Sequence, residues 1–269
     1  MIALLLSFVS LSFAFDQKPN KPIGECAADL PYGAPVLNNP NTTLRCTTGY
    51  AFQHDNVAKI SAWSAWTLTP DESVGCYPRT DVFEADLAIP KGQRAESSDY
   101  SKSGYDRGHM VPDGDLSYSL QTEHESFLMS NMSPQLPNLN RGVWKYLESS
   151  ERAWAWGRKH SLTIYSGNIY SVGLSKTIGE NKVVVPDFLY KIVIDNVTGE
   201  VLAFSFPQVE RQEINLKARL TSIAAIEKAT GITFPVPAGA DKNAVSKDVW
   251  PADIGDVMAA KKTSCKVKR

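Results

Sequence analysis

The sequence has few cysteines, few histidines and almost no net charge, and each shortage argues against a class of protein. Its four cysteines show no C-x-x-C spacing, whereas structural zinc usually has closely spaced ligand pairs. Its four histidines form no H-E-x-x-H motif, which argues against a metalloprotease. The formal net charge of -1 argues against a high-affinity nucleic-acid-binding module, since phosphate contacts depend on lysine and arginine. After residue 14, no apolar run is long enough to span a membrane.

The remaining composition is typical of one main globular domain with an export signal. The 269 residues are 43% hydrophobic and 10% aromatic, which supplies enough material for a sizeable core. Residues 1–14 form an uncharged apolar run ending in Ser12-Phe13-Ala14, which predicts a secretory signal peptide. The run lacks an initial basic residue, so a retained anchor or a buried helix stays as an alternative. We therefore expect a secreted or periplasmic protein that has no stable membrane association once the signal is removed.

The cysteines and the composition shifts divide the rest of the chain. Cys26, Cys46, Cys76 and Cys265 suit an oxidising compartment and allow two disulfides, in any of three connectivities. Residues 15–45 are rich in Pro, Asn and Gly and predict an irregular arm tied down by cysteines. Residues 46–236 form the main domain. Residues 237–269 form an extension whose basic tail is either a solvated terminus or a contact for nucleic acid.

Hydrophobic patterns within the main domain predict an α+β fold. β-branched and aromatic runs predict strands at residues 50–69, 162–170, 183–195 and 201–206. The turn at residues 196–199 makes the last two an antiparallel hairpin. Helices are expected at residues 139–156 and 216–230, the second ending at Gly231. We expect a mixed or antiparallel sheet flanked by helices.

The tetrapeptide Asp-Arg-Gly-His at residues 106–109 combines side chains suited to phosphodiester hydrolysis. His109 can take a proton near neutral pH, and Arg107 can hold a phosphate. Asp106 is interpreted as a partner that orients the loop. The nearby Asp113 and Asp115 offer a competing carboxylate pair for a metal ion, but their setting is equally a turn signal.

A second polar set follows at a four-residue step along the expected helix. Asn140, Trp144, Glu148 and Arg152 would form one slowly rotating stripe, which suits the wall of a cleft. An amide oxygen binds a hard metal ion without neutralising its charge. Simpler interpretations remain: Asn140 as a helix N-cap, and Glu148 with Arg152 as a surface ion pair.

The order of these motifs resembles the DNA/RNA non-specific endonucleases with a ββα-metal site, which include secreted bacterial nucleases and mitochondrial endonuclease G. The resemblance covers roughly residues 49–235. The matching pieces are residues 106–109, 130–135, 139–144, 147–148 and 152. Weaker matches follow at residues 166–167, 185–191, 226–231 and 234. The main domain would then be a nuclease domain built around a ββα-metal motif.

The resemblance also implies roles for individual residues. His109 corresponds to the general base and Asn140 to the one direct protein ligand of a catalytic Mg²⁺, for which Mn²⁺ would substitute. Glu148 corresponds to a residue that holds metal-bound waters, and Asn131 to an asparagine that organises the site. The phosphate-contacting positions correspond to Arg107 and Arg152, and more loosely to Arg79, with Arg94 as its rival.

The resemblance implies hydrolysis of DNA and RNA with little sequence specificity, giving 5′-phosphate ends. The acidic balance is unexpected for this function, because residues 79–152 contain twelve acidic and eight basic residues, a formal charge of -4. Positive charge must therefore be arranged locally. Two alternatives are a phosphodiesterase or phosphatase acting on small nucleotides, and a non-catalytic nucleic-acid-binding protein of the same fold. A protein inhibitor and the oligomeric state are left open.

Overall fold

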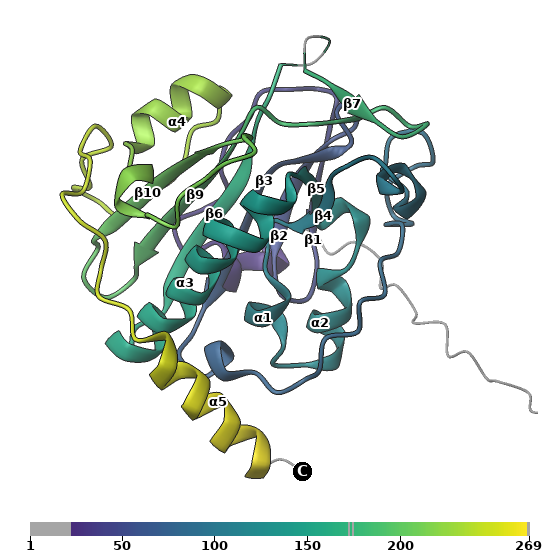
Figure 1. The fold of residues 1–269 in the computed structure, drawn as a ribbon. Coiled ribbons are helices and arrows are strands. Elements are labelled where there is room, and N and C mark those ends of the chain that lie inside the picture. Colours follow the sequence, from purple (N-terminus) through teal and green to yellow (C-terminus); the bar gives the residue numbers. More distant parts are fainter. Residues whose placement is uncertain (1–22, 172, 174, 268–269) are drawn as a thin grey trace, which may run out of the picture.

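A six-stranded antiparallel sheet forms the centre of the molecule in the computed structural model, which describes residues 23–171, 173 and 175–267 (Figure 1). The expected signal peptide, Lys268 and Arg269 lie outside the described residues. The strand order is β1-β2-β3-β6-β9-β10. The strands are β1 Thr42–Cys46, β2 Ala51–Asp55, β3 Ile60–Leu68, β6 Leu162–Ile169, β9 Phe188–Asp195 and β10 Val201–Pro207. The expected α+β class with an antiparallel sheet is confirmed.

The hairpin β9–β10 forms where the sequence predicts it. Gly199 has a φ of 73° and donates its N–H to the Asp195 carbonyl at 2.8 Å, which closes the turn. The strand expected at residues 183–195 is interrupted, however. Its first residues form β8 (Val183–Val184), which pairs with β7 (Thr177–Ile178), and β9 begins only at Phe188. Pro186 lies in the gap, where its missing N–H cannot continue the strand pairing.

The helix expected at residues 139–156 consists of two parts. A π-helical segment, η5 (Leu139–Trp144), leads into α3 (Lys145–Arg158), and Gly142 departs from helical geometry with φ -103° and ψ -112°. Such π segments change which side chains share a face, because each turn contains more residues than an α-turn. The four-residue stripe therefore does not form a single straight face.

The prediction of a helix at residues 216–230 is wrong for most of its first half. Only the short η6 (Lys217–Arg219) forms there, and α4 (Ile223–Thr230) begins after Ser222. Thr221 donates its N–H to the Ala203 carbonyl on β10 at 2.9 Å, so the chain is extended against the sheet edge. Ser222 then caps α4 by accepting from Ala225 N at 3.1 Å.

The C-terminal extension contains a helix that the composition does not predict, α5 (Ile254–Val267). Figure 1 shows α5 running beside α3 at the lower edge of the molecule. Val257 of α5 packs with Ala153 of α3 and with Val74 of η2 (Glu72–Val74). No helix among the described residues is long and apolar enough to cross a membrane.

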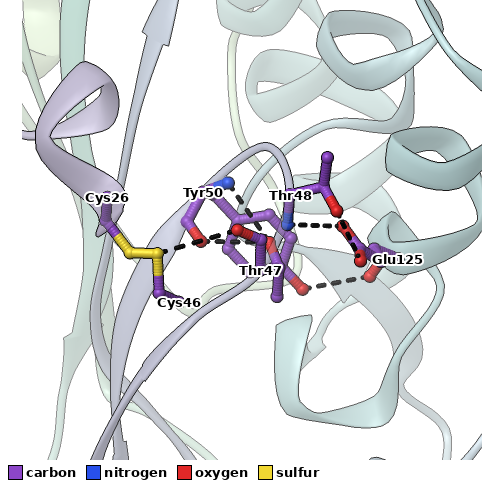
Figure 2. The surroundings of a disulfide bond; sticks show 6 residues. All are labelled: Cys26, Cys46, Thr47, Thr48, Tyr50 and Glu125. Atoms are coloured by element: carbon purple, nitrogen blue, oxygen red, sulfur yellow. Dashed lines mark hydrogen bonds between the residues drawn. A yellow bond between two sulfur atoms is a disulfide. The ribbon is translucent and has the colours of Figure 1, made fainter. Parts of the chain in front are cut away.

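Both expected disulfides form, as Cys26–Cys46 and Cys76–Cys265. The first joins the short helix η1 (Ile23–Asp29) to the end of β1, which crosses the boundary expected after residue 45 (Figure 2). The turn after β1 is also anchored, because Thr48 donates through its N–H and hydroxyl to the Glu125 carboxylate at 2.8 and 2.9 Å. Glu125 belongs to α2 (Leu120–Ser126), so the turn that follows the disulfide is held by this helix.

The sheet is covered on both faces, and β3 shows how its residues alternate between them. Trp66 and Leu68 point into a core cluster shared with α3, whereas Trp63 and Ala65 point into a cluster shared with α4. The polar groups described below lie on the α3 side. The remaining elements are α1 (Asp113–Leu116), η3 (Ser97–Tyr100), η4 (Met129–Asn131), β4 (Asp106–His109) and β5 (Met132–Gln135).

Candidate active site

Two short strands and a helix carry the predicted site residues. β4 and β5 pair antiparallel, with Asp106 opposite Gln135 and His109 opposite Met132, and the chain then enters η5 and α3. Gly108 is required by close approach, because a side chain at this position would overlap Gln135. The ββα arrangement thus follows directly from the Asp-Arg-Gly-His sequence and the segment after it.

A cavity of about 510 Å³ brings most of the predicted residues together. We call it the catalytic cavity. Five cationic side chains and two carboxylates line it, so its lining is locally positive although the chain as a whole is not. The lining residues are Arg79, Arg107, His109, Asp113, Gly114, Asn140, Arg141, Lys145, Glu148 and Arg152.

His109 is buried at the end of β4 and is held by its backbone and by aromatic rings. The Trp144 indole donates to the His109 carbonyl at 3.2 Å, and the Phe127 ring meets the imidazole edge-to-face at 5.0 Å between centroids. The Nε2 atom has no hydrogen-bond partner in the described part of the chain. Burial lowers the pKa of His109 to about 4, so the imidazole is neutral at pH 7 and its unprotonated nitrogen can accept a proton.

Asn140 is oriented by Asp106 and does not cap a helix. Its Nδ2 donates to the Asp106 carboxylate at 2.9 Å, so its amide oxygen is directed away from that contact. Arg141 donates twice to the same carboxylate, at 2.8 and 2.6 Å. Burial raises the pKa of Asp106, but these hydrogen bonds outweigh it and the net pKa is lowered. Asp106 is therefore an ionised acceptor that fixes the Asn140 amide, whereas the sequence suggests only that it orients its own loop.

The oxygen atoms of Asn140 and Glu148 fit a hard divalent cation. Neither the Asn140 amide oxygen nor the Glu148 carboxylate accepts a hydrogen bond from any described residue, although both residues line the catalytic cavity. No three His, Cys, Asp or Glu side chains within the described ranges converge as a metal cage. Such a sparse donor set suits Mg²⁺, which keeps several of its water ligands.

Glu148 also departs from the simpler interpretation as the partner of Arg152 in a surface ion pair. Arg152 is bound elsewhere, and no ion pair joins these two side chains within the described ranges. Burial raises the pKa of Glu148 to about 8, against the lowering effect of the nearby Lys191 and Arg152. A bound cation would favour the ionised carboxylate.

Two arginines of the cavity are held by the two carboxylates of α1. Arg79 donates to Asp113 at 2.7 Å, and Arg152 donates to Asp115 at 2.7 Å. Asp115 is fully buried and also accepts from the Trp66 indole at 3.1 Å. Each carboxylate is thus engaged by an arginine, so Asp113 and Asp115 do not form the competing metal site considered from the sequence.

Arg107 reaches the cavity across two aromatic rings. Its guanidinium lies 5.2 Å from the Phe83 ring centroid and 5.8 Å from that of Tyr100, and it donates to the Ser97 carbonyl at 2.8 Å. Arg94, the rival of Arg79, is instead bound to Glu96 at 2.9 Å and does not line the cavity. The geometry favours Arg79 as the additional cation.

Asn131 does not line the catalytic cavity. Its side chain is fully buried, accepts from Val111 N at 3.0 Å and donates to the carbonyls of Val111 and Ser126 at 2.9 Å. Its own carbonyl accepts from Met110 N, so it holds the chain directly after His109. The sequence places Asn131 among the catalytic residues, but its contacts are those of a residue that positions the chain after His109.

Two cavity residues, Arg141 and Lys145, have no role assigned from the sequence. They are four residues apart and lie beside Asn140 and Glu148, a spacing that itself predicts one shared helix face. Trp144, in contrast, belongs to the polar stripe by spacing but is fully buried in the core. The wall of the cavity is thus the 141–145–148–152 side of η5 and α3, with Asn140 at its start.

The chain is similar to known nucleases in sequence and in fold. Residues 32–239 match the model of the DNA/RNA non-specific endonuclease family. A nuclease of Nostoc sp. is 33% identical over 217 residues, covering 76% of this chain and 77% of the relative. Human mitochondrial endonuclease G is 28% identical over 217 residues, covering 76% and 71%. In the crystal structure of the EndoG/EndoGI complex, a 25% identical chain superposes with a TM-score of 0.69, covering 77% of this chain and 90% of that one.

Proposed function

The chain belongs to the DNA/RNA non-specific endonuclease family, whose members are metal-dependent hydrolases of phosphodiester bonds, and from this premise we propose a mechanism centred on His109 and Asn140. The enzyme would cleave DNA and RNA with little sequence specificity and leave 5′-phosphate ends. One observation supports the proposal most: a single cavity contains a neutral histidine, a fixed amide oxygen, a glutamate that accepts no hydrogen bond from the described residues and several arginines.

His109 is the proposed general base. Burial lowers its pKa, so the imidazole is unprotonated at neutral pH and its free nitrogen is available for a proton from a water molecule, while the charge of a bound phosphate would favour the protonated ring that forms. The water oxygen attacks phosphorus, and the bond from phosphorus to the 3′ oxygen breaks. Phe127 packs edge-to-face against the ring and Trp144 holds the His109 backbone carbonyl, so little reorientation accompanies the proton transfer.

Asn140 would hold Mg²⁺ directly, and Glu148 would hold its waters. When bound, the ion supplies positive charge that offsets the negative charge developing on the phosphate and the leaving oxygen. Asp106 fixes the amide so that its oxygen, and not its NH₂ group, is available as a ligand.

Arg79, Arg107 and Arg152 would contact the phosphate backbone. Guanidinium groups match the geometry of phosphate oxygens, and phosphate contacts carry no base information. Weak sequence preference and action on both DNA and RNA follow from such contacts. Two disulfides, Cys26–Cys46 and Cys76–Cys265, also support a secreted or periplasmic location, because they persist in oxidising compartments.

The test is cleavage of supercoiled plasmid and of RNA by the purified chain, in a series of divalent metals and in EDTA. We expect nicking with Mg²⁺ and with Mn²⁺ and none in EDTA, with ends that a 5′-phosphate-dependent ligase can join. Full activity in EDTA would contradict the metal-dependent mechanism. Release of phosphate from small nucleotides without plasmid nicking would instead support the phosphodiesterase or phosphatase alternative.

A further inference from the structure

The short helix α1 holds both arginines at one wall of the catalytic cavity but is only one turn long. Asp113 and Asp115 lie within its four residues, Asp113–Leu116. An isolated turn of helix is unstable in water, because nucleation fixes several dihedral angles for very few hydrogen bonds. Contacts from outside α1 must therefore hold it, and with it Arg79 and Arg152.

Ser117 is one point at which such contacts reach α1, beside the Trp66 indole on Asp115 and the Thr122 hydroxyl on the Leu116 carbonyl. Its hydroxyl donates to the Gly114 carbonyl of α1 at 3.0 Å, and its carbonyl accepts from Tyr77 N at 2.9 Å. Lys261 of α5 donates from Nζ to the Ser117 hydroxyl at 3.3 Å. A cation near the last carbonyls of a helix is favourable. Through Lys261 and Ser117, α5 is thus connected to α1.

The helix α5 is fixed in this position by covalent and packing contacts. The Cys76–Cys265 disulfide, with 5.2 Å between its Cα atoms, ties it to the segment three residues before Arg79. Asp256 accepts from the Trp156 indole of α3 at 2.9 Å. The family match ends at residue 239, so α5 lies outside the part of the chain shared with the family model.

The electrostatics of Lys261 connect it to the same wall of the cavity. Burial lowers the pKa of Lys261, and Arg152 lowers it further, whereas Asp113 and Asp115 raise it. Gly114, whose carbonyl accepts from Ser117, lies against Arg152, since a Cβ at position 114 would be 2.9 Å from Arg152 Nη1. Lys261, α1 and Arg152 therefore form one contiguous set of neighbours.

We propose that α5 is a positioning element of the active site, in which Lys261 and the Cys76–Cys265 disulfide hold α1, and thereby Arg79 and Arg152, in place. This inference rests on the proposed nuclease function. Lys261 acts through Ser117 and does not touch the substrate. The expected signature is a loss in kcat, because misplaced arginines stabilise the transition state less well.

The first test compares Lys261→Ala with Lys262→Ala, an exposed neighbour on the same helix with the same charge. In plasmid cleavage we expect kcat to fall about tenfold for Lys261→Ala, with KM changed less than about twofold, and Lys262→Ala to match the wild type. Lys261→Arg should restore most of the activity. Ser117→Ala should produce the same loss, and the double variant no further loss, because both remove one connection.

The second test removes the disulfide in Cys76→Ser/Cys265→Ser, with Cys26→Ser/Cys46→Ser as the matched control. At a temperature where circular dichroism shows both variants folded, only the first should show the kcat loss. A rise in KM with a weaker salt dependence for Lys261→Ala would overturn the proposal in favour of a direct phosphate contact. Equal activities of Lys261→Ala and Lys262→Ala would also overturn it. An inactive wild type would instead refute the proposed function.

Discussion

Two hollows border α3, and the larger one lacks the chemistry of the smaller. The catalytic cavity measures about 510 Å³, whereas a second hollow, here called the distal hollow, measures about 600 Å³. They use different sides of the same helix, with Glu148 and Arg152 facing one and Tyr146, Ser150 and Trp154 facing the other. The distal hollow is completed by residues 213–217 and 248–252.

The two hollows differ in how their polar groups are engaged. In the catalytic cavity, neither His109 Nε2 nor the Glu148 side chain has a hydrogen-bond partner among the described residues. In the distal hollow, the Trp154 indole donates to the Trp250 carbonyl at 2.9 Å. Lys217 forms a solvent-exposed ion pair with Asp248 at 2.9 Å. The volume of a hollow therefore does not identify the active site. Polar atoms with unused hydrogen-bonding capacity, lying beside fixed cations, do identify it.

The largest expected effect comes from removing the two groups on which the catalytic cavity depends. His109→Ala removes the base, and we expect kcat for plasmid cleavage to fall by about 10³-fold. Asn140→Ala should cause a comparable loss together with loss of the response to Mg²⁺. Tyr146→Ala, on the distal side of α3, is the matched control. A His109→Ala variant with wild-type activity would show that the catalytic cavity does not differ from the distal hollow in this way.

A smaller loss is expected from Asp106→Ala, which leaves every proposed ligand in place but frees the Asn140 amide to rotate. Loss of a group that orients a metal ligand typically costs about 10- to 100-fold in metal affinity or activity. Asp106→Asn should retain part of the function, since its amide oxygen can still accept from Asn140. The measurement is Mg²⁺ titration by calorimetry alongside cleavage. Unchanged Mg²⁺ affinity in Asp106→Ala would contradict the orienting role.

A graded effect of pH follows from Glu148, whose pKa burial raises to about 8 in the metal-free protein. Below that pH the carboxyl must lose a proton when the cation binds, so binding weakens as pH falls. We expect apparent Mg²⁺ affinity to drop up to about tenfold per pH unit below 8 and to level off above it. Glu148→Gln should bind more weakly and without this pH dependence. A flat profile in the wild type would show that Glu148 is already ionised.

The smallest effect is expected in the distal hollow. Lys217→Ala breaks an exposed ion pair with Asp248, and such pairs contribute about 0–1 kcal/mol to stability. Cleavage rates should stay within about twofold of the wild type at low and high salt. A marked rise in KM for Lys217→Ala or Tyr146→Ala would show that nucleic acid extends over α3 into the distal hollow, which would weaken the contrast between the two sides.

The sequence predicts those parts of the site whose residues lie close together along the chain. It does not predict the contacts that residues far apart in the sequence make with one another. The Asp-Arg-Gly-His strand and the residues from Asn140 to Arg152 meet in one cavity because a ββα unit is nearly contiguous. The ion partners of Arg79 and Arg152 could not be predicted, since Asp113 and Asp115 lie 34 and 37 residues away from them. A count of charges along residues 79–152 is also uninformative, because the cavity collects cations that the sequence separates.

The fold shows the same division between local and distant causes. The β9–β10 hairpin was predictable from the turn ending at Gly199, since the strands beside it are neighbours in sequence. The first half of the helix expected at residues 216–230 fails because Thr221 finds a sheet partner in Ala203. The helix α5 follows a Pro-, Ala- and Asp-rich segment and is fixed by a partner cysteine far away in the sequence. Such contacts leave no local periodic signal.

The Cys76–Cys265 disulfide also sets an order of events during biosynthesis. Its cysteines are separated by 189 residues, and the second lies within α5. The ribosome makes the chain from its N-terminus, so this link cannot close until the 189 residues from Cys76 to Cys265 have been added. The segment that leads to Arg79 is therefore fixed covalently only after α5 has been made. A chain truncated before α5 would contain His109 and Asn140 but would lack this final link.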